Sequence, residues 1–139
     1  MLILLQMGME IHLARGIIAA IREEAARAHP YEACGLLLGR GEVVAQIRPC
    51  ANVAPDPSRH FEVDPLALIA AFREERDGAR QVLGYYHSHP TGDSRPSATD
   101  AAMAPRDGRI WAICGGGTVS WWRDGANGFE VLSTRDVEG

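Results

Sequence analysis

The chain has 139 residues, of which 46% are hydrophobic and 23% are charged. This length and composition are typical of one globular domain with its own core, and we expect that domain to cover residues 1–139. The 14 basic and 18 acidic residues give a net charge of −4, and because no dense Lys or Arg run occurs, nucleic acid is excluded as the main partner. Residues 1–5 (MLILL) lack a signal peptide's basic flank and cleavage pattern, and no stretch approaches the ~18 apolar residues of a membrane span, so we expect a cytoplasmic protein with no membrane contact.

The first part of the chain predicts a short strand, an amphipathic helix and a hairpin. Residues 7–11 have the composition of a short strand. Apolar residues recur at helical spacing over 13–28, and His29-Pro30 ends this helix because the residue before proline is pushed out of the helical region. The apolar run 33–39 is closed by a Gly-Arg-Gly turn, and 43–47 follows as the return strand of a hairpin.

The middle of the chain predicts a loop, a second helix and an exposed strand end. Three prolines make 49–58 a loop, and 60–63 is a candidate for a brief strand. Asp64-Pro65 is an N-cap followed by proline at the first helical position, which opens a helix that ends near Arg76. Residues 81–89 predict another strand, and 90–96 an exposed loop.

A short helix beginning at Ser97 and three strands complete the predicted elements. The strands cover residues 110–114, 118–123 and 129–133, and Gly-rich turns join them. This order of helices and strands favours a mixed α/β architecture of the α+β type. Its helices would pack on a mixed, largely antiparallel sheet.

A candidate metal site lies where the strand over 81–89 ends. His87 and His89 are two residues apart, so on a strand their side chains project from the same face. Pro90 stops the strand directly afterwards, which leaves the pair accessible beside a loop. Asp100, in the first turn of the following helix, can supply a third ligand. Two imidazoles and one carboxylate, with the fourth position left to water, are typical of a catalytic zinc.

Ser97 lies three residues before Asp100, and its pattern has two interpretations. Its hydroxyl could donate a hydrogen bond to an oxyanion that develops beside the metal. Ser-x-x-Asp at the start of a helix is also close to a capping box, in which both side chains satisfy free backbone amides. The two roles do not exclude each other, because a cap also fixes the side chain in place.

Together these residues resemble the signature of the JAMM (MPN+) metallopeptidases. The matching pattern is His87-x-His89, ten intervening residues and Asp100, with Ser97 three residues before it. The upstream segment 29–39 (HPYEACGLLLG) resembles the segment in which this family places its catalytic glutamate, and residues 61–65 (FEVDP) are also similar to small bacterial members. The resemblance covers most of the chain, and the fold that it implies is the curved, helix-flanked sheet of the JAMM/MPN domain.

This resemblance implies a role for each matched residue. His87, His89 and Asp100 would bind Zn²⁺, and Ser97 would help to hold the tetrahedral oxyanion. Glu32 would take a proton from the zinc-bound water and later deliver it to the leaving amine. Reasoning from the residues alone does not select Glu32 over Glu62 or Glu130, which leaves this assignment to the family likeness.

The function implied is that of a zinc metallopeptidase that hydrolyses a peptide or isopeptide bond. The expected substrate is a ubiquitin-like or sulfur-carrier protein cleaved after its C-terminal Gly-Gly tail, and 60–63 is the candidate edge strand for that tail. A non-catalytic MPN-type scaffold and a zinc amidohydrolase acting on a small amide are the alternatives. A homodimer is possible, because the apolar run 1–5 could pair between two copies or close a sheet edge within one.

The remaining cysteines and histidines predict no second site. An odd number of cysteines without paired spacing does not suggest a disulfide framework, and it favours reduced, buried thiols over metal ligands or nucleophiles. We expect the remaining histidines to lie on the surface or in the core. These residues are Cys34, Cys50, Cys114, His12, His29 and His60.

Overall fold

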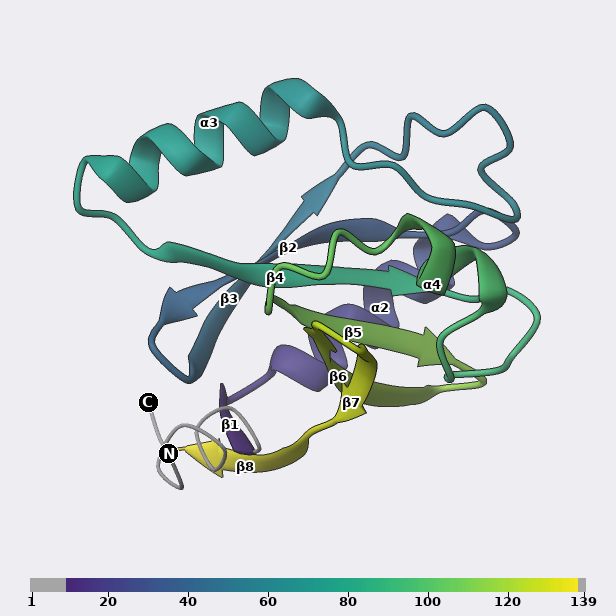
Figure 1. The fold of residues 1–139 in the computed structure, drawn as a ribbon. Coiled ribbons are helices and arrows are strands. Elements are labelled where there is room, and N and C mark those ends of the chain that lie inside the picture. The colour runs from purple at the N-terminus through teal and green to yellow at the C-terminus, as the bar shows by residue number, and fades with distance from the viewer. Residues whose placement is uncertain (1–9, 138–139) are drawn as a thin grey trace.

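The computed structural model describes residues 10–137, which form one eight-stranded sheet with three helices (Figure 1). In chain order the elements are β1 (Glu10–Ala14), α2 (Ile17–Ala28), β2 (Cys34–Arg40), β3 (Val43–Cys50), α3 (Pro65–Arg76), β4 (Gln81–Ser88), α4 (Ala98–Met103), β5 (Ile110–Gly115), β6 (Thr118–Gly125), β7 (Gly128–Val131) and β8 (Ser133–Val137). No helix among the described residues is long and apolar enough to cross a membrane.

The sheet is mixed, and β4 lies near its centre. The strand order is β7-β6-β5-β4-β2-β3-β1-β8. β2 is antiparallel to both β3 and β4, and β6 is antiparallel to β5 and β7. The pairs β4–β5, β1–β3 and β1–β8 are parallel. This arrangement confirms the predicted mixed sheet with flanking helices, and four of its seven strand pairs are antiparallel.

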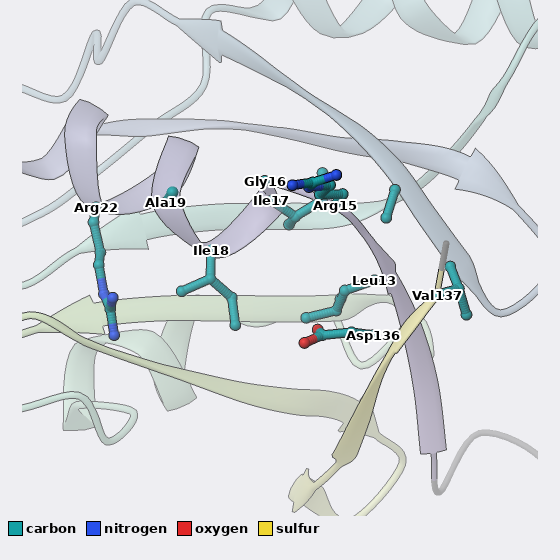
Figure 2. A pocket seen from close by; sticks show the side chains of 10 residues that line it. Leu13, Arg15, Gly16, Ile17, Ile18, Ala19, Arg22, Asp136 and Val137 are labelled. Atoms are coloured by element: carbon teal, nitrogen blue, oxygen red, sulfur yellow. The ribbon is translucent and has the colours of Figure 1, made fainter. Parts of the chain in front are cut away.

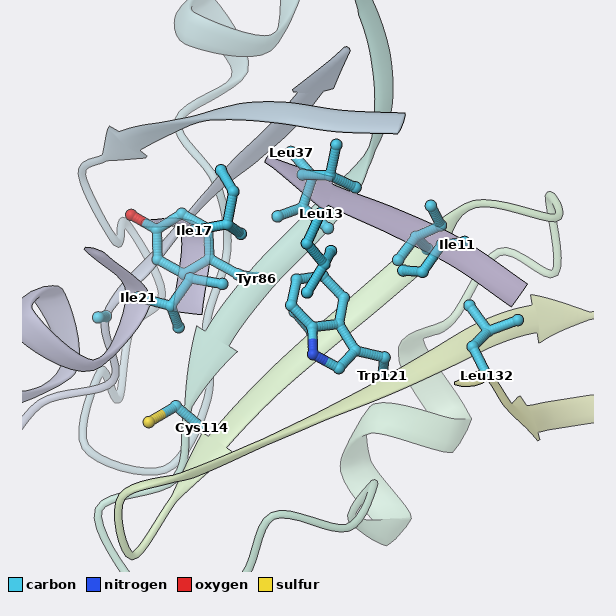
Figure 3. Packing of buried hydrophobic residues seen from close by; sticks show 13 residues of the cluster. Ile11, Leu13, Ile17, Ile21, Leu37, Tyr86, Cys114, Trp121 and Leu132 are labelled. Carbon is cyan, nitrogen blue, oxygen red and sulfur yellow. The ribbon is translucent and has the colours of Figure 1, made fainter. Parts of the chain in front are cut away.

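The two longer helices cover opposite faces of the sheet, and β2 packs against both. Leu37 joins the core cluster beneath α2, whereas Leu36 and Leu38 join a second cluster beneath α3. Successive residues of a strand point to opposite faces, so the unbroken Leu-Leu-Leu run is buried on both sides. Figure 3 shows the larger cluster, in which Leu37 and Tyr86 pack near the start of α2.

Gly84 lets β4 and β5 approach each other closely. A Cβ at this position would overlap the backbone of Ile110 in β5, including its carbonyl oxygen. The parallel ladder then runs from the Gly84–Ile110 pair to Ser88–Cys114 and carries His87 into the centre of the sheet. A glycine early in β4 therefore helps to position the strand end where the candidate metal ligands lie.

Local sequence signals placed α3 and the end of α2 correctly. The Asp64 carboxylate accepts a hydrogen bond from the Leu66 backbone N–H (3.0 Å), and Pro65 is the first helical residue, as predicted. The helix before His29-Pro30 ends at Ala28. Predicted strands 81–89, 110–114 and 118–123 correspond to β4, β5 and β6 within one or two residues at each end.

Four of the expected boundaries are wrong. The first helix begins at Ile17, because residues 10–14 pair with β3 and β8 as β1 and Gly16 then adopts a positive φ of 87°. The hairpin's return strand continues to Cys50, through the predicted start of the loop. Residues 60–63 form no strand; Val63 makes only an isolated bridge with Asn52. The segment 129–133 is divided between β7 and β8. The apolar run 1–5, with its two expected roles, and residues 7–9 lie outside the described residues.

Candidate metal centre and active site

β4 places His87 inside the protein, on the face of the sheet that α3 covers. Its side chain is fully buried, and it pairs across the sheet with Cys34 of β2. The ring of Phe61 stacks on the imidazole, with centroids 4.2 Å apart and planes 16° from parallel. The edge of Trp111 meets the same imidazole at 5.6 Å. These aromatic contacts fix the plane of the His87 ring.

His89 lies one residue beyond β4, yet its ring meets that of His87 as the spacing predicts. The two Nε2 atoms are 3.1 Å apart. The backbone N–H of His89 donates to the carbonyl of Cys114 (2.8 Å), and its Nδ1 lies 2.6 Å from the carbonyl oxygen of Asp93. Because a carbonyl can only accept, Nδ1 carries the hydrogen. A neutral His89 therefore presents the lone pair of Nε2 towards His87, as in metal-ligating histidines.

α4 supplies the carboxylate that joins the two rings. Asp100 is buried, and its Oδ1 lies 3.1 Å from Nε2 of His87 while its Oδ2 lies 3.0 Å from Nε2 of His89. Ser97 forms the complete capping box: its Oγ accepts from the Asp100 N–H (3.0 Å), and its own N–H donates to Asp100 Oδ2 (2.9 Å). The capping interpretation of Ser97 is therefore present in the structure. A hydroxyl that accepts one hydrogen bond still has its own hydrogen to donate.

Glu32 reaches the same place from a distant part of the sequence. It lies between α2 and β2, is only 5% exposed, and has a carboxylate oxygen within 4.8 Å of ring nitrogens of His87 and His89. Glu62 and Glu130, which residue reasoning could not separate from it, are both exposed. Asp100 contacts the two imidazoles directly, whereas Glu32 stands further back.

Burial and mutual contact move the pKa values of these four groups apart. Burial dominates at His87 and lowers its pKa despite the neighbouring carboxylate. At His89 burial disfavours the protonated, charged ring, but hydrogen bonds to Asp100 and to the Asp93 carbonyl outweigh burial and raise its pKa. Burial alone would raise the pKa of Asp100, yet its contacts with the two histidines hold it far below its usual range. Burial raises the pKa of Glu32 to about 7.

The donor set fits a zinc ion. Atoms about 2.0–2.1 Å from zinc at the corners of a tetrahedron are about 3.3 Å apart, close to the 3.0–3.1 Å observed between the two Nε2 atoms and the Asp100 oxygens. Nitrogen and carboxylate ligands are those that zinc takes in hydrolases. Without a cation, two imidazoles that face each other at 3.1 Å and share one carboxylate need an added proton, and the raised pKa of His89 reflects that demand. A divalent ion would replace that proton.

Three smaller cavities border the site, of which one, of about 320 Å³, is lined by His89. The other two lie on different sides of the site. One of about 230 Å³ reaches Asp100 and has an apolar wall that includes Phe61, Leu68 and Met103. Another, of about 410 Å³, reaches Glu32 beside Tyr31 and Asn52. A larger cavity of about 720 Å³ lies elsewhere, between β1, the start of α2 and β8 (Figure 2).

Sequence reasoning missed three residues that organise the site. Phe61 stacks on His87, the carbonyl of Asp93 holds His89, and Asn52 contacts the backbone of Glu32. The family resemblance included Phe61 within its similar segment but gave it no role. Nothing in local spacing marks Asn52 or Asp93, because each acts through contacts that only the folded loop makes.

The remaining cysteines and histidines lie as expected, outside the group of ligand atoms. The three cysteines are free; Cys34 and Cys114 are buried and Cys50 is half-buried. Burial raises the pKa of Cys34 to about 12, which favours the thiol over the reactive thiolate at neutral pH. The three other histidines, His12, His29 and His60, are exposed or half-buried.

Comparison with known proteins gives a consistent family assignment. Residues 14–124 match the family described as prokaryotic homologs of the JAB domain. A desampylase of Haloferax volcanii is 36% identical over 100 residues, which cover 70% of this chain and 72% of that protein. A probable TtuB-protein conjugate cleaving protease of Thermus thermophilus is 39% identical over 98 residues, covering 70% and 65%.

Solved structures show the same fold. A protein from Desulfitobacterium hafniense superposes with a TM-score of 0.80 at 28% identity, over 93% of this chain and 94% of that one. A JAB1/MPN domain protein from Archaeoglobus fulgidus superposes with a TM-score of 0.58 at 22% identity, over 90% and 96%. The second likeness shows the fold alone, and it agrees with the mixed, helix-flanked sheet of this chain.

Proposed function

Since the chain belongs to the prokaryotic JAB family and is a JAMM-type hydrolase, we propose that it cleaves the bond that follows the C-terminal Gly-Gly of a ubiquitin-like or sulfur-carrier protein. The bond is a peptide bond in an extended precursor or an isopeptide bond in a conjugate. The names of the two relatives, a desampylase and a TtuB-conjugate cleaving protease, support conjugates of ubiquitin-like proteins as the substrate class.

The proposed zinc ligands are His87, His89 and Asp100. The observation that carries this proposal is the convergence of two Nε2 atoms and one carboxylate within 3.1 Å of each other. A zinc ion held there supplies a Lewis acid that polarises the substrate carbonyl and acidifies a water molecule. The hydrogen bond from Nδ1 of His89 to the Asp93 carbonyl fixes the tautomer in which the neutral ring offers Nε2 as the ligand nitrogen.

Glu32 is the proposed general base and acid. Its carboxylate lies close to both histidines without the direct contact that Asp100 makes, so it can take a proton from the attacking water and pass it to the leaving amine. A group that must both accept and release a proton works best with a pKa near the operating pH, and burial raises that of Glu32 to about 7. The Ser97 hydroxyl, fixed by the capping box, is the proposed donor to the oxyanion.

These proposed roles determine in which orientation the substrate chain would cross the site. The leaving amine must lie beside Glu32, which protonates it. The Gly-Gly tail then approaches from the side of Asp100 and the apolar cavity that contains Phe61 and Met103. Residues 60–63 offer no strand for the tail to extend, because only Val63 pairs, and it pairs with Asn52. Their side chains instead line that cavity.

The test is cleavage of a ubiquitin-fold protein that carries a short extension after Gly-Gly, together with a lysine-linked conjugate of the same protein. We expect cleavage directly after Gly-Gly, lost in Glu32→Ala and in His89→Ala and retained in Glu130→Ala, whose side chain is an exposed glutamate on β7. Mass spectrometry of the products locates the cut. Full activity in Glu32→Ala would overturn the base assignment, and hydrolysis of small amides without any Gly-Gly cleavage would favour an amidohydrolase.

A further inference from the structure

The Asn52 side chain is the centre of a hydrogen-bond network beside the candidate base. Its Nδ2 lies 3.1 Å from the carbonyl oxygen of Glu32, 3.0 Å from that of His60 and 3.4 Å from that of Pro57. Its Oδ1 accepts from the backbone N–H groups of Ala54 (3.0 Å) and Glu62 (3.1 Å). One half-buried amide thus satisfies backbone groups in three separate stretches of chain.

The partners determine the orientation of this amide and the residue type that suits it. Carbonyl oxygens only accept and backbone N–H groups only donate, so Nδ2 must face the three carbonyls and Oδ1 the two N–H groups. An aspartate would keep the acceptor but place an oxygen against the carbonyls. An apolar residue of similar size would leave all five groups without this partner.

Glu32 needs such a support because no regular element holds its backbone. It lies after α2 has ended at Ala28 and before β2 begins at Cys34. On one side, Ala33 is attached to β4 by two hydrogen bonds with Ser88. On the other side, the Glu32 N–H donates to the Pro57 carbonyl (2.7 Å) and its carbonyl accepts from Asn52. The loop that contains Asn52 and Pro57 therefore holds the Glu32 backbone on the side away from β4.

The same network reaches a candidate metal ligand. Asn52 fixes the N–H of Glu62 and the carbonyl of His60, the two neighbours of Phe61 in the chain. Phe61 in turn stacks on the ring of His87. Asn52 thereby links the backbone of the proposed base to the residue that orients one proposed ligand.

We propose that Asn52 is a positioning residue that holds the backbone of Glu32, and through it the carboxylate, at the reacting water. The inference rests on the proposed function for the role of Glu32, but the contact between Asn52 and Glu32 is independent of it. The hydrogen bonds of the Asn52 side chain go to backbone groups and not to His87, His89 or Asp100, so the proposal assigns its effect on the reaction to Glu32.

The test compares two variants with a matched control from the same loop. Asn52→Leu removes all five hydrogen bonds, whereas Asn52→Asp keeps the two that Oδ1 accepts and loses the donation to Glu32. Ser58→Ala is the control, because within residues 10–137 the Ser58 hydroxyl bonds only to the exposed Asp56 carboxylate in the same loop (3.0 Å). Hydrogen exchange at the Glu32 amide, kcat and KM are measured for each, and kcat again in a Glu32→Gln background.

We expect kcat to fall about 10- to 100-fold in both Asn52 variants with KM within about threefold, because a displacement of about 1 Å at a catalytic group costs rate rather than binding. In the Glu32→Gln background the same substitutions should cause no further loss. The Glu32 amide should exchange at least about tenfold faster while amides of β5 keep their protection, since local opening precedes global unfolding. Ser58→Ala should match the unmodified protein throughout.

Equal losses with and without Glu32 would overturn the proposal, because they would indicate a merely structural role. Retention of kcat in Asn52→Asp would also overturn the proposal, because the other hydrogen bonds of the loop would then hold the Glu32 backbone without the donation from Asn52. If the unmodified protein cleaves no Gly-Gly substrate, the proposed function fails. Hydrogen exchange still tests the contact by itself, because unchanged exchange of the Glu32 amide in Asn52→Asp would show that Asn52 does not hold the Glu32 backbone.

Discussion

Glu32 is 5% exposed as a residue, and burial raises the pKa of its carboxyl group from 4.5 to about 7. In an unfolded chain the same group ionises near 4.5. Between these two values the folded protein keeps a proton that the unfolded chain has released, so this group's contribution to the free energy of unfolding falls as pH rises through the window. The residue proposed to perform the chemistry is thus a source of instability at neutral pH, as is common at active sites.

At the residue scale we therefore predict that Glu32→Gln stabilises the metal-free protein at pH 8. The neutral amide removes a penalty of about 1–3 kcal/mol, after allowance for partial solvent screening of the carboxylate. Below pH 4.5 the Glu32 carboxyl is protonated and therefore neutral, like the glutamine amide, so the difference in the free energy of unfolding should vanish. Urea unfolding with a chelator present, at pH 8 and at pH 4, measures both values. Equal stabilities at pH 8 would show that burial does not raise this pKa.

α4 is a helix of 6 residues; its first turn holds the proposed ligand Asp100, and its N-cap is the proposed oxyanion donor Ser97. So short a helix is not stable by itself and depends on its cap and on packing. The capping box couples the two residues, because Ser97 accepts from the Asp100 backbone while the Asp100 side chain accepts from the Ser97 backbone. A change at Ser97 therefore reaches the metal site through the helix, even if the hydroxyl has no catalytic role.

At the element scale, Ser97→Ala should lower the free energy of unfolding by about 1 kcal/mol through loss of the cap. It should also lower kcat by about 100-fold per zinc-bound protein if the hydroxyl donates to the oxyanion. Ser97→Thr keeps a hydroxyl and serves as the control for both effects. Denaturation, metal analysis and kinetics on the same preparations separate the two. A rate that falls only in proportion to zinc content would mean that Ser97 acts as a cap alone.

The candidate site joins separate parts of the molecule. Its residues come from β4 and the residue that follows it, from α4, and from the connection between α2 and β2. A cation held there binds the folded state and not the unfolded chain, so it stabilises the whole protein by mass action. At about a thousand times its dissociation constant the gain is about 4 kcal/mol.

At the scale of the whole molecule, zinc should raise the thermal midpoint by about 10 °C, and a chelator should reverse the shift. The shift should disappear in His87→Ala and in Asp100→Ala. His12→Ala is the matched control, since His12 lies on β1, where its Nε2 is 3.3 Å from a carboxylate oxygen of Glu10, apart from the site. Differential scanning calorimetry with and without zinc measures the effect. An equal shift in all variants would locate the metal elsewhere.

Several elements could be predicted because their signals are local. The Asp64 cap with Pro65, the end of α2 before His29-Pro30, and the parity that brings His87 and His89 together all depend on neighbours within a few residues. Backbone sterics and side-chain periodicity decide such features wherever the segment lies in the fold. The likeness to the JAMM family then supplied Glu32, which the structure brings to the same group.

The sequence by itself determined the fold class, the two histidines and the capped helix that carries Asp100. The tertiary structure decided which apolar residues before Gly16 join the sheet, because β1 gains its partners only from β3 and β8. It also decided that residues 60–63 line a cavity instead of forming a strand, and that Asn52 supports Glu32. The physical reason is the same in each case: these contacts join residues far apart in sequence, and local propensity carries no information about which distant groups the folded chain brings within hydrogen-bonding distance.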